Sequence, residues 1–161
     1  MNELGLPPRV AEIVDGSVAW ERMDGINYES VGYFLSCHLV VEHYLDEYLK
    51  IEYPKLNWDA SRQTFGQKVS LLSDFKVSDK YDCIPAIKHM NSLRNKLSHQ
   101  LDFVIKKNDL LPMIDYLEKV YEKKQEVPDE PKEILSRFTT MTCVLFAGYI
   151  SAKAKANSGQ I

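Results

Sequence analysis

The segment "MNSLRNKLSHQL", residues 90–101, carries the most informative pattern in the chain. Its apolar residues recur at helical spacing, and together with Ile87 they form one stripe along a predicted helix. At about 100° per residue, Arg94 falls in the middle of this stripe, while His99 points roughly 140° away. A guanidinium on an apolar face needs an acidic partner. The segment therefore predicts a helix that carries an unusual polar group.

The same helical period runs through the rest of the 161 residues, and strand patterns are nearly absent. Turn residues and prolines separate six predicted helices, at residues 8–23, 29–51, 60–75, 82–101, from 108 onward, and 131–156. Asp59 or Ser61 is the expected cap of the third helix, and Pro85 and Pro112 fall in first turns, where proline is tolerated. Without repeats or long linkers, residues 1–161 are predicted to form one all-α helical bundle.

Composition and charge restrict the class of protein. Hydrophobic residues make up 45% and charged residues 27%, as in soluble globular proteins, and a net charge of −3 argues against general nucleic-acid binding. Residues 88–107 nevertheless form a basic segment with a single acid, Asp102. Three widely spaced cysteines and the lack of a leader pattern predict reduced thiols in a cytoplasmic protein. The apolar run "FTTMTCVLFAGYI" is shorter than a bilayer requires, so it predicts a buried helix or a subunit contact, with no membrane association.

The helix predicted at residues 29–51 supplies an acid for Arg94. Its apolar stripe has His38 and Glu42 at its centre, one helical turn apart. The simplest packing sets this stripe against that of the motif helix, so that Glu42 pairs with Arg94 and His38 is a core histidine bonded to Glu42. Both residues then have structural or supporting roles.

The pattern Arg-Asn-x3-His, "RNKLSH" at residues 94–99, is expected only about 0.005 times by chance in a chain of this composition. It resembles the Arg-x(4–6)-His motif of HEPN domains, which are small helical bundles. Upstream, "CHLVVEHYLDEYL" is similar to the long helix of these domains, and "TFGQKVSLLSDF" resembles the connecting helix in the bacterial branch near the mannitol repressor and the HEPN toxins. The resemblance covers residues 29–124 and leaves residues 131–156 as an additional C-terminal helix.

Many HEPN proteins are metal-independent endoribonucleases that work as dimers. The resemblance implies RNA as the substrate, a homodimer, no cofactor and no metal, in a toxin or RNA-targeting defence or stress role, and a nucleotidyltransferase-type antitoxin is one natural partner. Arg94 and His99 would be the catalytic pair, with Asn95 as a supporting polar residue. The basic segment adds three candidate RNA-binding residues, Lys96, Lys106 and Lys107.

Other functions stay open at this stage. The main alternative is a non-catalytic HEPN-like regulatory or binding module, similar to the mannitol repressor, in which Glu42 neutralises Arg94. A metal site near Cys37 is disfavoured because His38 and His43 are five residues apart and do not share a helix face. The chain has no glycine-rich nucleotide-binding motif, and its basic residues do not gather on a DNA-reading helix.

Overall fold

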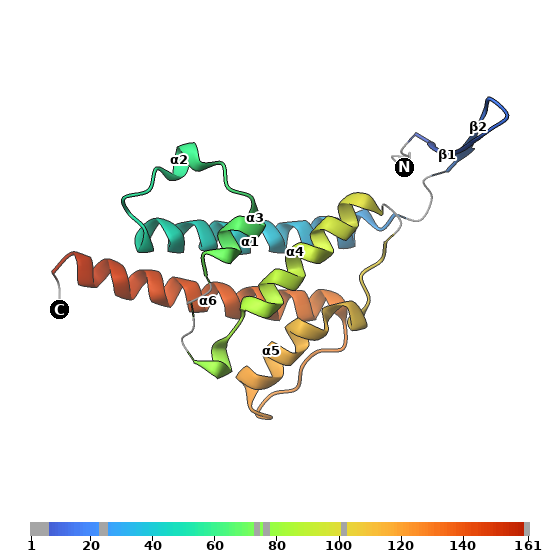
Figure 1. The fold of residues 1–161 in the computed structure, drawn as a ribbon. Helices are drawn as coiled ribbons and strands as arrows, with labels where there is room; N and C mark the ends of the chain where they lie inside the picture. The colour runs from blue at the N-terminus through green and yellow to red at the C-terminus, as the bar shows by residue number, and fades with distance from the viewer. Residues whose placement is uncertain (1–6, 23–25, 73–74, 76–77, 101–102, 160–161) are drawn as a thin grey trace, which may run out of the picture.

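The structure, a computed structural model, describes residues 7–22, 26–72, 75, 78–100 and 103–159. This part of the chain is mainly helical and has one short two-stranded sheet near its N-terminal end (Figure 1). In chain order the elements are β1 (Arg9–Val14), β2 (Ser17–Glu21), α1 (Tyr28–Glu52), α2 (Trp58–Ser61), α3 (Phe65–Ser70), η1 (Asp79–Tyr81), α4 (Ile84–His99), η2 (Lys107–Leu110), α5 (Leu111–Tyr121) and α6 (Pro131–Asn157).

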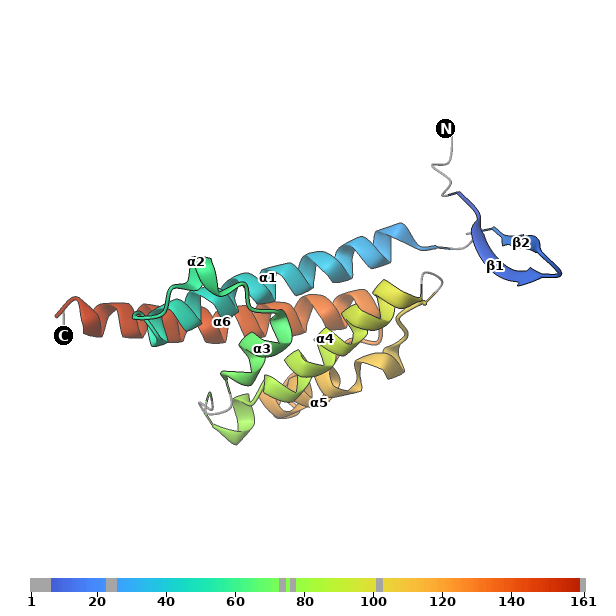
Figure 2. The ribbon, with the colours of Figure 1, turned by 45° about the horizontal axis from the view of Figure 1, so that its top comes forward.

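The two long helices α1 and α6 lie side by side and run in the same direction, which both Figure 1 and Figure 2 show. Ion pairs join them near both ends: Lys132 lies 2.6 Å from Glu29, and Lys153 lies 3.3 Å from Glu52. The Tyr149 hydroxyl also donates to Glu52, over 2.7 Å. Because the offset in residue number is nearly the same at both ends, these contacts fix the register of the pair.

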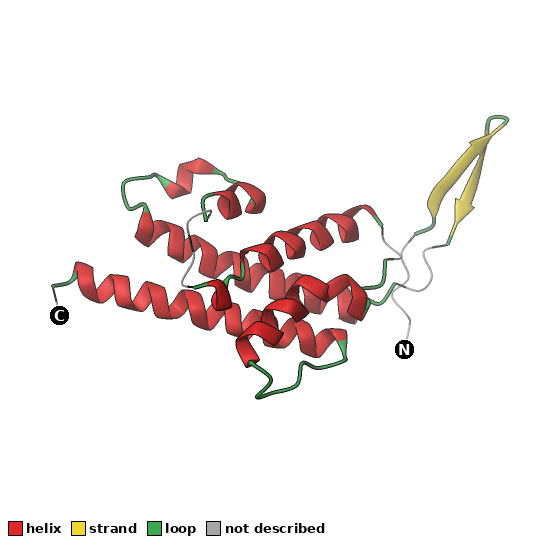
Figure 3. Cartoon of the chain, turned by 60° about the horizontal axis from the view of Figure 1, so that its bottom comes forward, coloured by secondary structure: helices red, strands yellow, loops and turns green. Residues whose placement is uncertain are grey.

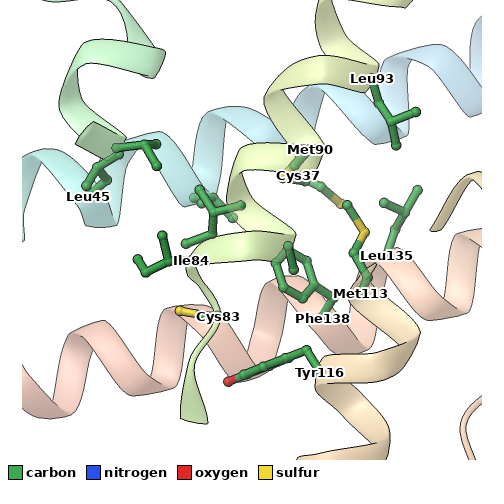
Figure 4. Packing of buried hydrophobic residues seen from close by; sticks show 14 of the residues in the cluster. Cys37, Leu45, Cys83, Ile84, Met90, Leu93, Met113, Tyr116, Leu135 and Phe138 are labelled. Carbon is green, nitrogen blue, oxygen red and sulfur yellow. The ribbon is translucent and has the colours of Figure 1, made fainter. Parts of the chain in front are cut away.

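The core forms where α3 and α4 pack against α1, and α5 packs against α4 and α6 (Figure 4). All three cysteines are free and buried, as predicted for reduced thiols. The largest fully buried side chains come from every major helix: Phe34, Leu45, Leu49, Leu72, Ile87, Met90, Leu110, Met113, Leu117, Ile134, Phe138 and Phe146. A shared core of this kind holds α4 at a fixed position against α1.

The helix predicted at residues 8–23 is wrong, because most of this segment is an antiparallel hairpin of β1 and β2. Asp15 and Gly16 both have positive φ, 51° and 76°, which suits the tight turn of a two-residue hairpin. A register shift between Val10 and Glu12 breaks the two-residue alternation of β1. The apolar residues Val10 and Ile13 are therefore three apart, which imitates a helical period. The predicted end, near Met23, lies outside the described residues.

The other predicted helices differ mainly at their ends. The helices predicted at 29–51 and 131–156 are confirmed, and the one at 82–101 is confirmed over Ile84–His99. The helix predicted from residue 108 begins as the 3₁₀ turn η2 and continues as α5, with Pro112 in its first turn.

The helix predicted at 60–75 is shorter than expected and is preceded by a separate turn of helix, α2. Its predicted caps were wrong. Thr64 caps α3 in a reciprocal capping box with Gln67, and Asn57 caps α2. Because Arg62 adopts a left-handed conformation at the end of α2, the chain turns before α3 begins.

Helix α6 combines a long apolar surface with a packed face. Within the described residues it is the one helix long and apolar enough to cross a membrane, judged by length and composition alone. The shorter apolar run considered from the sequence understated this property. Six side chains of α6 are buried in this fold, which places part of that apolar surface against α1 and α5.

Candidate functional site

The motif residues lie on the second half of α4, whose buried stripe holds the helix against the body. This stripe consists of Ile84, Ala86, Ile87, Met90, Leu93 and Leu97. Leu93 occupies the place that the sequence assigned to Arg94, and the predicted stripe member Leu101 lies outside the described residues. Arg94 is exposed at the edge of the stripe, so its predicted position in the middle was wrong.

Arg94, Asn95 and His99, here called the motif surface, are all exposed. The Arg94 Nη1 atom donates to the Asn95 Oδ1 atom over 3.4 Å, and in the described part of the chain no acid forms an ion pair with Arg94. His99 is the last residue of α4 and has no hydrogen-bond partner among the described residues. The guanidinium and the imidazole are therefore both open to a ligand.

Glu42 does not pair with Arg94, contrary to the prediction. It accepts a hydrogen bond from Lys68 of α3, with 2.9 Å between the Lys68 Nζ and Glu42 Oε1 atoms. The same ammonium lies 2.8 Å from the Asp46 carboxylate. Burial opposes the charge on Lys68, but hydrogen bonds to Asp46 and Glu42 outweigh it and raise the Lys68 pKa. Glu42, Asp46 and Lys68, here called the lysine cluster, thus satisfy one another.

His38 lies between these two groups and is buried, with 4% of its surface exposed. Its ring centroid is 4.2 Å from that of Phe65 on α3. The predicted bond to Glu42 does not form in the described structure, where Glu42 accepts from Lys68, and the His38 Nε2 atom has no hydrogen-bond partner there. Burial lowers the His38 pKa, the Glu42 carboxylate opposes this, and the Arg94 guanidinium lowers it further. Both charges therefore act on one buried imidazole at the junction of α1 and α4.

Arg94 and His99 do not converge within one chain. Five residues of helix turn them roughly 140° apart and separate them by about 7.5 Å along the axis. The last turn of α4 ends cleanly, because the Gln100 amide donates to the Lys96 carbonyl over 2.9 Å. One chain therefore presents a guanidinium on one side of α4 and an imidazole on another.

The basic residues around the motif differ in how free their charges are. Lys96 lies over the Phe103 ring, 3.8 Å from its centroid, and Lys107 pairs with Asp129. Lys106 is exposed at the start of η2. Of the three predicted RNA-binding lysines, Lys107 thus already has an acidic partner.

Two positioning residues were missed from the sequence. Lys68 neutralises Glu42, and His89 ties η2 to α4, since its Nε2 atom lies 2.6 Å from the Asp109 carbonyl oxygen. A carbonyl only accepts, so His89 donates from Nε2 in this contact. Neither pairing leaves a local signature in the sequence, because each partner comes from a different element.

The geometry defines a mainly helical protein whose motif helix crosses α1 and carries a guanidinium that has no ion-pair partner among the residues the structure describes. No group of three or more His, Cys, Asp or Glu side chains is placed to hold a metal ion within the described ranges. The chain matches no protein-family model, no curated protein and no solved structure. The function must therefore be argued from the site.

Proposed function

We propose that this protein is a metal-independent endoribonuclease of HEPN type that works as a homodimer in the cytoplasm. The observation that carries the proposal is the exposure of Arg94, Asn95 and His99 while the nearby acids are neutralised by Lys68. An arginine held by Glu42 would have had little capacity for phosphate. Among the described residues the Arg94 guanidinium donates to an amide oxygen and has no acidic partner, which leaves it able to bind an anion.

The residue types suit cleavage by the RNA's own 2′-hydroxyl. That hydroxyl attacks the adjacent phosphorus and displaces the 5′-oxygen of the next nucleotide, leaving a 2′,3′-cyclic phosphate and a 5′-hydroxyl. Arg94 stabilises the charge on the non-bridging oxygens, and His99 transfers a proton. His99 is the last residue of α4, so its imidazole lies at the exposed end of the motif helix. Asn95 orients the guanidinium through its amide oxygen.

A two-fold dimer would bring together an Arg94 and a His99 that point apart within one chain. In such a dimer, His99 of one subunit works beside Arg94 of the other, and both motif surfaces face one cleft. Leu35 of α1, three residues before His38, is 38% exposed and offers apolar surface for such a contact.

A toxin restrained by a nucleotidyltransferase-type antitoxin is the cellular role that we propose with this activity. The second candidate is a non-catalytic, mannitol-repressor-like binding module. It is favoured by the divergence of Arg94 and His99 on one chain and by the net charge of −3. Its other argument, an Arg94 neutralised by Glu42, no longer holds.

The test is an RNA cleavage assay in EDTA, with total cellular RNA and a synthetic single strand as substrates. Wild type is compared with Arg94→Ala and His99→Ala. Lys88→Ala removes another exposed cation of α4, and His43→Ala removes another exposed histidine, so these are the matched controls. We expect wild type and both controls to cut, both motif variants to fail, and the ends to be cyclic phosphates. Intact RNA with folded wild type would favour the binding module instead.

A further inference from the structure

The chain between α1 and α3 forms an arch that carries α2, which Figure 1 and Figure 3 show. Between this arch and α1 lies a cavity of about 200 Å³, here called the arch cavity. Pockets for drug-sized ligands measure about 300–1,000 Å³, so this cavity suits a smaller ligand, such as a single flat ring system. The side chains that line it include Asp46, Lys50, Trp58, Asp59, Arg62 and Lys68.

Trp58 lines the arch cavity and is held in a fixed orientation. Its Nε1 atom donates to the Tyr53 carbonyl oxygen over 3.1 Å, and Asn57 caps the helix that carries it. The side chain also packs against the hydrophobic core. Because its one polar atom is already satisfied, the indole can offer the cavity its apolar ring, and such rings stack flat nucleobases.

The charged side chains of the arch cavity fall into two groups. Asp46 and Lys68 pair with each other in the lysine cluster, and Lys50 pairs with an acid on its own helix. Asp59 and Arg62 are exposed and form no side-chain hydrogen bond or ion pair with the residues that the structure describes. The cavity therefore presents a carboxylate acceptor and a guanidinium donor, both available to a ligand, beside an aromatic ring.

Among the nucleobases, guanine fits this set of groups best. Its Watson–Crick edge has two adjacent donors, N1–H and N2–H, which match the two oxygens of the Asp59 carboxylate. Its O6 and N7 atoms are neighbouring acceptors, which an arginine such as Arg62 binds in a bidentate way. On the Watson–Crick edge, each of the other three bases has a single donor group flanked by an acceptor. They would leave part of the carboxylate without a donor.

A short connection links the arch cavity to the motif surface. Asn91 lies one turn before Arg94 on α4, and its Nδ2 atom would be 3.6 Å from a Cβ on Gly66 of α3. Gln63, which also lines the cavity, precedes Gly66 by three residues. These steps place the cavity within about 20 Å of Arg94. Sites for single-stranded nucleic acid cover roughly 4–16 nucleotides, so one strand can reach both places.

We propose that the arch cavity is a guanine-binding subsite for single-stranded RNA, in which the base stacks on Trp58, donates to Asp59 and accepts from Arg62. The link between this subsite and cutting rests on the proposed ribonuclease function. Recognition of the base does not, because it uses side chains that the cleavage mechanism leaves unused. The subsite would make this protein prefer strands that carry a guanine a few nucleotides from the cut.

Binding is tested with strands that cannot be cut. Trp20→Phe leaves Trp58 as the single tryptophan and changes no residue of the arch cavity. The ligands are 2′-O-methyl RNA hexamers of uridine with one guanosine, inosine or adenosine, placed at each position in turn. We expect the best guanosine hexamer to quench Trp58 emission and to bind at least about tenfold more tightly than its inosine and adenosine counterparts. Equal binding of the three bases, or no quenching, overturns the proposal.

Two variants test the assigned contacts within the same titration. Asp59→Asn and Arg62→Gln keep the size of each side chain and should each reduce the preference for guanosine to less than about threefold. Lys55→Gln removes another exposed cation of the arch, at a position that does not line the cavity, and should leave the preference unchanged. A guanosine preference that persists in both cavity variants would overturn the assignment.

The outcome for the subsite can be separated from that for the ribonuclease. If the hexamers show the guanosine preference but wild type leaves unmodified RNA intact, the subsite stands and the ribonuclease proposal fails. If wild type cuts RNA while the hexamers bind without regard to their base, the ribonuclease proposal stands and the subsite is wrong.

Discussion

The lysine cluster and the motif surface lie on either side of His38, and they differ in whether their charged side chains form ion pairs. In the lysine cluster, the Lys68 side chain is 13% exposed, and its ammonium forms ion pairs with both Glu42 and Asp46, each within 3 Å. On the motif surface, Arg94 donates to the neighbouring Asn95 amide and has no ion-pair partner among the described residues, and His99 has no hydrogen-bond partner among them. Both groups flank the same buried imidazole, so the difference does not come from their general location.

The difference separates a structural use of charge from a chemical one. Partly buried ions that satisfy one another contribute to the fold and are costly to break. Exposed ions without partners contribute little to stability and remain free for a ligand. If this distinction holds, changes in the lysine cluster should affect unfolding, and changes on the motif surface should affect activity. Each prediction below tests one part of it.

The largest effect is expected for RNA cleavage by variants of the motif surface. Arg94→Ala and His99→Ala should each lower the rate by about 10²–10⁴-fold, because in the proposed mechanism Arg94 stabilises transition-state charge and His99 transfers a proton. When the two inactive variants are mixed and allowed to exchange subunits, about a quarter of the wild-type rate should return. Half of the dimers are then mixed, and each mixed dimer has one complete site. No recovery on mixing would show that the two residues do not work across the dimer.

The second largest effect is expected for the stability of the protein when the lysine cluster is changed. Lys68→Met should lower the free energy of unfolding by about 1–3 kcal/mol, because Glu42 and Asp46 would be left close together without a cation. Urea unfolding at neutral pH measures it. Lys88→Met, at an exposed lysine of α4, is the matched control and should change little. Adding Glu42→Gln to Lys68→Met should recover part of the loss, and a failure to do so would mean that repulsion is not the cause.

The sequence could predict where helices form and which of their faces are buried, but not which charged side chains form ion pairs. The periodicity of α1, α4 and α6 located them within a few residues, since each buries a regular stripe. A helical wheel also placed Glu42 facing inward. It could not show that Lys68 would reach Glu42, because that contact depends on how the chain between α1 and α3 turns.

Two errors had local physical causes. The predicted stripe of α4 included Leu101, which lies outside the described residues, and left out Leu93. The buried stripe runs through Leu93 instead, and this leaves Arg94 at its edge. The hairpin was missed because a register shift in β1 turned an alternating pattern into a helical one. Its turn residues, Asp15 and Gly16, were the signal that could have revealed it.

A third prediction concerns the imidazole that lies between the two groups. The His38 pKa is held below its ordinary value near 6.5, so the unfolded chain takes up a proton first as the pH falls. The stability that His38 contributes is complete above about pH 6.5 and is lost as the pH falls below it. Urea unfolding from about pH 7.5 to about pH 5.5 should show this decline in wild type and a weaker one in His38→Phe. An equal decline in both would assign the pH dependence to other groups.

The smallest effect is expected for the stability of an Arg94 variant, and it tests the difference between the lysine cluster and the motif surface most directly. Arg94→Ala should change the free energy of unfolding by less than about 0.5 kcal/mol, because the guanidinium is exposed and has no acidic partner to lose in the described chain. Its removal even relieves His38 of a neighbouring positive charge. The same variant should lose nearly all cleavage, so a single substitution would separate stability from activity. If Arg94→Ala destabilised the protein as strongly as Lys68→Met, Arg94 would have a structural role, and the distinction between the lysine cluster and the motif surface would fail.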